Sequence, residues 1–163
     1  MRYISAMDEK REMLRHTVAS LAYRATRALE GTPEAFADFS GTGRQPVEIL
    51  AHMGDLFDWA LSAVQGNERW RNSRLHTWVI EQQRFFALLH AFDAYLASSE
   101  PLYASAEALF QGPIADALTH VGQLAMLRRI AGVPIKGENY YAADIAAGRV
   151  GAEQAAPRKP FDK

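Results

Sequence analysis

Three residues with metal-ligating side chains, His52, Asp116 and His120, occupy positions where the surrounding sequence is apolar. Successive residues of a helix are about 100° apart, which places His52 on the same face as Ile49 and Leu56. An imidazole on such a face loses hydration unless it is hydrogen-bonded or bound to a metal. His52 is therefore either a satisfied core histidine or a ligand.

Asp116 and His120 are four residues apart, so on a helix they are neighbours and point toward the same place. They share a face with Gln123 and with the apolar residues Leu124 and Leu127. The aspartate is the costlier residue there, because an unpaired buried carboxylate is strongly disfavoured. A hydrogen-bonded Asp–His pair has the same spacing, so the spacing alone does not distinguish it from a metal site.

If the two helices that carry these residues face each other, two imidazoles and one carboxylate meet. Such a set neutralises most of the charge of a divalent cation and suits a metal site with an open position. Helix bundles build their metal sites in this way, from side chains on facing helices. We therefore take His52, Asp116 and His120 as candidate metal ligands.

Four further residues are candidates for supporting this site. Gln123 lies one turn beyond His120, and Asp55 lies close to His52, so each is expected to orient a ligand. Asp55 also belongs to an arc of polar residues on its helix that should face water, with Glu48, Asp58, Ser62 and Gln65. Trp59 and Tyr140 are weaker candidates for lining a pocket, and packing of Tyr140 on a helix is an equal alternative. Glu48 is interpreted as a charge at the start of its helix rather than a ligand.

Other chemistry has little support in the sequence. The chain has no cysteine, which excludes disulfides, thiolate-held metals and a cysteine nucleophile. The segment GTGR at 41–44 is not a phosphate-binding loop, and no serine lies in a nucleophile elbow. His16, His76 and His90 are expected at the surface or at the edge of the core.

The elements that must position these residues are helices. Apolar residues at helical spacing, with Gly and Pro between the segments, predict helices at about 8–30, 46–65, 73–98 and 113–131. A short helical segment, 102–110, is expected to break at Gln111-Gly112. Because no run of β-branched residues alternates with polar ones, we predict an all-α fold, a four-helix bundle.

The 163 residues suffice for one domain with a substantial core, and the net charge of -1 argues against a general nucleic-acid binder. Charges precede any apolar run and no segment resembles a membrane span, so we expect a cytoplasmic protein that acts on a small molecule. Residues 1–135 are expected to form the bundle. Residues 136–163 are expected to form an extended or partly helical tail on it, with a frayed end.

Two stretches of the chain resemble the DinB-like (YfiT-like) family of four-helix bundles. They are PVEILAHMGDLFDWAL around His52 and DALTHVGQLAMLRRIAGVP around His120. The resemblance covers about residues 8–135 and does not extend to the tail. It implies a divalent metal held by three histidines, two of which correspond to His52 and His120, whereas Asp116 stands at the position of the third.

A carboxylate in that position makes the ligand set harder, and it lowers the net positive charge of the metal-bound site compared with three histidines. Zinc or nickel is the expected metal, and manganese or iron is compatible with the same set. The alternative is a degenerate family member that has lost the metal and retains a hydrogen-bonded Asp116–His120 couple.

The resemblance further implies a transferase that uses a low-molecular-weight thiol. Because the chain has no cysteine, a cosubstrate must bring the thiolate. A metal-dependent hydrolase is the first alternative. The second is a non-enzymatic, stress-related binding or dimerising bundle with a degenerate site. A homodimer is a separate expectation.

Overall fold

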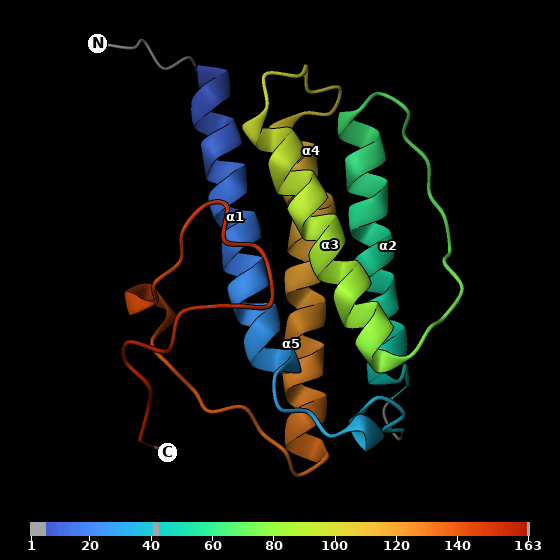
Figure 1. The fold of residues 1–163 in the computed structure, drawn as a ribbon, viewed down its shortest axis with the longest axis vertical. Coiled ribbons are helices and arrows are strands. Elements are labelled where there is room, and N and C mark those ends of the chain that lie inside the picture. Colours follow the sequence, from blue (N-terminus) through green and yellow to red (C-terminus); the bar gives the residue numbers. More distant parts are fainter. Residues whose placement is uncertain (1–5, 41–42, 163) are drawn as a thin grey trace.

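Four long helices carry the fold in residues 6–40 and 43–162, the part of the chain that the computed structural model describes (Figure 1). They are α1 (Ala6–Leu29), α2 (Pro46–Val64), α3 (Trp78–Ala97) and α5 (Ala115–Ile130). The short elements are η1 (Glu34–Phe36), α4 (Ala106–Leu109), the π-helical turn η2 (Phe110–Ile114) and η3 (Tyr140–Ala142). Within those residues there is no strand, only an isolated bridge between Glu138 and Pro160. The all-helical prediction is confirmed.

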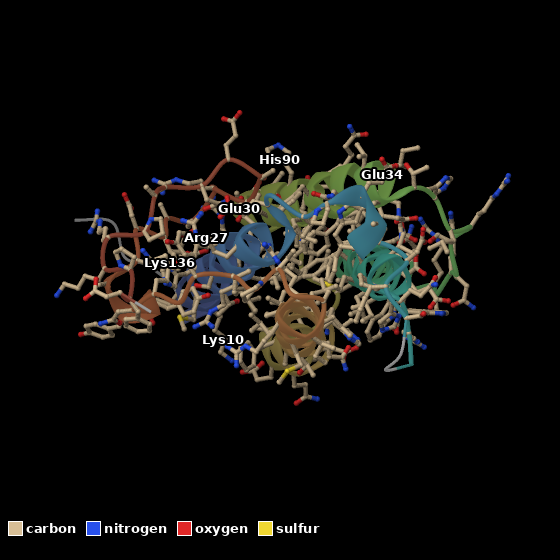
Figure 2. All side chains as sticks on the ribbon, turned by 90° about the horizontal axis from the view of Figure 1, so that it is seen from below. Lys10, Arg27, Glu30, Glu34, His90 and Lys136 are labelled. Atoms are coloured by element: carbon tan, nitrogen blue, oxygen red, sulfur yellow. The ribbon has the colours of Figure 1, made fainter. Side chains whose placement is uncertain are left out.

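The four helices enclose an interior filled by side chains, as the view along the helices shows (Figure 2). Phe57 of α2 contacts Phe85 and Phe92 of α3 edge to face, with ring centroids 6.1 and 5.6 Å apart. On α1, Leu14, Val18 and other residues of the predicted apolar stripe are buried. No described helix combines the length and the apolarity that crossing a bilayer requires.

Helix α2, which carries His52, begins and ends as its sequence predicts. Pro46 is the first helical residue, and Gln45 and Glu48 cap each other reciprocally. The Gln45 N–H donates to the Glu48 carboxylate at 2.8 Å, so Glu48 is a helix-start residue as expected. At the other end Gly66 has a φ of 77°, a conformation that favours glycine and stops the helix.

Helix α3 begins five residues later than the predicted start at 73. The expected first turn is extended instead, because side chains of α2 and of α3 itself accept from two of its backbone N–H groups. The Ser73 N–H donates to Asp55 at 3.2 Å and the His76 N–H donates to Glu81 at 3.0 Å. Thr77 then caps the helix by accepting from the Ile80 N–H.

The predicted break at Gln111-Gly112 is wrong. The chain continues from α4 through η2 into α5 as one helical run with a single wide turn. A π-turn inserts one residue into the helical repeat and here accommodates Pro113, which has no N–H to donate. The turn ends directly before α5. It therefore sets the direction in which the side chain of Asp116, the second residue of α5, projects from the helix.

The tail after α5 lies along α1 on the outer side of the bundle (Figure 1). Its anchor is Glu138, whose carboxylate accepts from the Tyr23 hydroxyl at 2.7 Å and from Arg27 Nε at 3.1 Å. Arg27 points from α1 toward this tail (Figure 2). Near its end the Phe161 N–H donates to the Gly137 carbonyl, so the tail closes on itself.

Candidate metal centre

Helices α2 and α5 bring His52, Asp116 and His120 to one place. His52 Nε2 lies 3.6 Å from Asp116 Oδ2, and His120 Nε2 lies 3.4 Å from Asp116 Oδ1. The two imidazoles are perpendicular, with ring centroids 4.9 Å apart. One ligand atom from each of the three residues lies within 4.8 Å of the others.

The imidazole nitrogens approach different oxygens of Asp116, and both separations are longer than a normal N–H···O bond. Nitrogen and oxygen ligands at about 2.0–2.2 Å from a tetrahedral Zn²⁺ are about 3.3–3.6 Å apart, whereas N–H···O bonds are about 2.9 Å long. Both imidazoles turn Nε2 toward the carboxylate, as ligands of a shared ion would. The donor set of two nitrogens and one oxygen therefore fits the metal that the sequence implies.

Gln123 fixes the orientation of one of these imidazoles. His120 Nδ1 donates its proton to Gln123 Oε1 across 2.7 Å, one turn along α5. A proton on Nδ1 leaves the lone pair on Nε2, the atom that faces Asp116. Gln123 thus has the orienting contact that its spacing predicts.

His52 is held in its neutral form by its surroundings. Partial burial lowers the pKa of its imidazole, and the nearby charges of His120 and Arg44 lower it further, whereas Asp116 opposes them. The ring of Trp70 lies beside it, with centroids 5.7 Å apart. A neutral imidazole keeps the lone pair that a metal requires.

The carboxylate is the open side of the cluster. The side chain of Asp116 is 45% exposed, compared with 25% for His52 and 12% for His120. The imidazoles therefore form the inner wall, and the carboxylate lies toward solvent. An ion held here would retain room for a further ligand, which is the property of catalytic rather than structural sites.

A cavity of about 450 Å³ adjoins the cluster. His120 and Gln123 form part of its wall, and the remaining lining residues are Arg44, Ile49, Met126, Leu127 and Ile130. Sequence reasoning did not identify Arg44, Met126 or Trp70 as site residues. Met126 could have been found, because it follows Gln123 by three residues on the same helix.

Asp55 does not orient His52, which corrects one prediction. Its carboxylate accepts from Arg84 Nη1 at 3.0 Å and from the Ser73 N–H at 3.2 Å. Asp55 and Ser62 were also expected to face water, and both are buried. The reason is the long loop before α3, which covers this side of α2 and bonds to both side chains.

Neither aromatic candidate lines the cavity beside the cluster. Trp59 packs edge-on against Trp70, donates to Glu68 at 3.0 Å and borders a separate cavity of about 110 Å³. Tyr140 packs on α1, where Arg24 lies 3.9 Å from its ring centroid, as the alternative interpretation held. Trp70 is the aromatic residue that contacts the site.

The remaining histidines stand apart from the cluster. His16, His76 and His90 are all exposed, which places them at the surface, one of the two expected environments. Of the titratable groups described, the set formed by His52, Asp116 and His120 is the one whose geometry could hold a metal ion.

Replacing Gln123 with leucine is expected to weaken zinc binding by about 10- to 100-fold, because His120 loses the partner that fixes its tautomer and ring orientation. Gln123→Glu, which keeps an acceptor oxygen, should retain most of the affinity. The measurement is competition with a chromophoric chelator at constant pH. Equal affinities for the leucine variant and the wild type would contradict this role of Gln123.

No family model, curated protein or solved structure matches this chain. The interpretation of the site therefore depends on its own chemistry. Two imidazoles, one carboxylate, a hydrogen bond that orients His120 and an adjoining cavity suit a metal ion that acts on a small molecule.

Proposed function

We propose that this protein is a divalent-metal-dependent enzyme that binds its metal through His52, Asp116 and His120. The observation that carries the proposal is the convergence of three ligand atoms within 4.8 Å from two separate helices. The bond from His120 to Gln123 supports it, because it orients His120 Nε2 toward Asp116. His52 supports it too, because a hydrogen-bonded Asp116–His120 couple needs no third group from α2.

We further propose membership of the DinB-like family, on the motifs around His52 and His120. The bundle of four long helices is compatible with this assignment, and so is the place of Asp116 beside both imidazoles. The carboxylate makes the ligand set harder than three imidazoles. Zinc or nickel remains the expected metal, and manganese or iron is also compatible.

The proposed reaction is transfer involving a low-molecular-weight thiol. A bound divalent metal with an open position supplies positive charge that lowers the pKa of a thiol or of water and stabilises negative charge on a substrate. The chain itself has no cysteine, so the thiol must come from a cosubstrate. Gln123 holds His120 in place, and Ile49 and Leu127 present an apolar wall to the substrate.

Hydrolysis is the second candidate, favoured by the exposure of Asp116, which gives water access to the open side of the site. The two reactions differ in whether the metal-loaded protein consumes a thiol. Glutathione with an aromatic chloride tests the first reaction, and a nitrophenyl ester without thiol tests the second. We expect metal-dependent consumption of the thiol.

Metal content is the decisive measurement for the proposal. We expect wild-type protein purified without a histidine tag to contain about one zinc or nickel ion per chain by elemental analysis. His120→Ala should lose that ion, while His90→Ala, which changes an exposed histidine on α3, should keep it. A metal-free wild type with the same helical circular dichroism as His120→Ala would instead support a non-enzymatic binding bundle.

A further inference from the structure

The cavity beside the metal cluster has two chemically different parts. His120 and Gln123 belong to the proposed metal site, whereas Ile49, Leu127 and Ile130 are apolar. Its volume of about 450 Å³ lies within the range of about 300–1,000 Å³ that is typical of small-molecule sites.

The apolar part continues the face of α5 that carries the metal ligands. Positions 116, 120, 123, 127 and 130 follow the helical repeat, so the ligands and the apolar residues form one stripe. Met126 and Ile130 are 55% and 52% exposed, although both are large and apolar. Two such side chains at the wall of a cavity offer an apolar ligand a surface that the fold itself leaves uncovered.

Arg44 is the charged residue of this cavity. It is exposed, in the loop before α2, and none of the described residues that line the cavity is acidic. A guanidinium beside an apolar surface, with no carboxylate in the same wall, is suited to an anionic ligand.

We propose that the substrate is a small amphipathic carboxylate, with its carboxylate paired to Arg44 and its apolar part against Ile49, Met126 and Ile130. This inference rests on the proposed function, because it places the substrate in the cavity that adjoins the metal ligands. A bound divalent cation and Arg44 together exceed the single negative charge of Asp116, so the loaded site attracts an anion.

The test is calorimetric titration with two probes of equal chain length, octanoate and 1-octanol, on metal-free and zinc-loaded protein. We expect the wild type to bind octanoate about fivefold more tightly than octanol, the ratio typical of one partly exposed ion pair. Arg44→Gln should abolish the preference in the metal-free protein and reduce it in the zinc-loaded protein, where the cation still attracts a carboxylate. Arg129→Gln, which removes an exposed charge from α5 outside the cavity, should preserve it.

A second variant tests the apolar wall. In Met126→Gln the new side chain is similar in size but polar. The affinities for both probes should fall by about threefold to tenfold, and the ratio of the two affinities should not change. Met13→Gln, on the exposed face of α1, is the matched control and should leave both affinities unchanged.

The results separate this inference from the proposed function. Equal binding of the two probes by the wild type, or no binding of either, overturns the inference. A preference that survives in metal-free Arg44→Gln also overturns it, because the carboxylate is then bound by something other than Arg44. If zinc fails to bind but the Arg44-dependent preference persists, the proposed function is wrong while the carboxylate site stands.

Discussion

Replacing Asp116 with alanine is expected to lower the affinity for zinc by more than about a hundredfold and to leave the fold intact. Loss of a residue that only orients a ligand lowers the metal affinity by about 10- to 100-fold, and loss of the ligand itself lowers the affinity further. The side chain of Asp116 is 45% exposed, so its removal opens no buried cavity. Chelator competition gives the affinity, and circular dichroism gives the helical content.

Two variants make this experiment specific. Asp116→His should bind zinc or nickel at least as well as the wild type but manganese less well, because imidazole is a softer ligand than carboxylate. Asp58→Ala removes a carboxylate from α2 outside the cluster and should change nothing. A zinc affinity of Asp116→Ala close to that of the wild type would exclude Asp116 as a ligand.

The convergence of the three candidate ligands could be predicted because each signal is local. His52 interrupts the apolar face of one helix, and Asp116 and His120 interrupt the apolar face of another. Polar side chains on the apolar faces of two helices come together where those faces meet. The burial expected of Asp116 was wrong, because its side chain lies at the rim of the contact and is 45% exposed. The contact of Gln123 with His120 follows from the same helical spacing.

The environment of Asp55 could not be predicted in this way. Its position on α2 favours exposure, and its burial depends on Arg84 of α3 and on the extended segment at Ser73. These partners are 29 and 18 residues away along the chain, and no periodicity connects them to Asp55. Arg44 and Trp70 were missed for a related reason, since both lie in loops, where spacing does not determine direction.

The π-turn before α5 and the anchoring of the tail are tertiary effects as well. Gly112 and Pro113 both predict a helix break, and the packing of Pro113 and Ile114 into the core overrides that preference. Glu138 is one of four acidic residues in an irregular tail, and no sequence pattern distinguishes it from the others. Its burial becomes evident only when Tyr23 and Arg27 of α1 lie opposite it.

Replacing Arg84 with methionine is expected to lower the free energy of unfolding by about 3–5 kcal/mol. For a chain of this size, such a loss lowers the melting temperature by about 10 °C or more. The guanidinium joins Glu81, Asp55 and the Ala51 carbonyl, at 2.8 Å and 3.0 Å for the two carboxylates. The Glu81 side chain is wholly buried and that of Asp55 is 10% exposed. Methionine fills a similar volume but leaves both carboxylates without their cation.

Urea denaturation measures this loss, and Arg71→Met is the matched control. Arg71 is exposed, so its replacement should change stability by less than about 0.5 kcal/mol. The loss of stability in Arg84→Lys should lie between those of the other two variants. An ammonium group keeps the positive charge, but it lacks the planar guanidinium geometry that reaches three acceptors. A loss below about 1 kcal/mol for Arg84→Met would show that the two carboxylates find other partners.

Gly54 provides an independent test of the same contact. A Cβ at position 54 would lie 2.7 Å from Arg84 Cζ, and the guanidinium has little freedom to retreat because three acceptors hold it. Gly54→Ala should therefore destabilise the wild type by about 2 kcal/mol. In the Arg84→Met background the same change should be neutral or stabilising by up to about 1 kcal/mol, since alanine favours a helix over glycine. If the effect of Gly54→Ala on stability is the same in both backgrounds to within about 0.5 kcal/mol, Gly54 does not make room for Arg84.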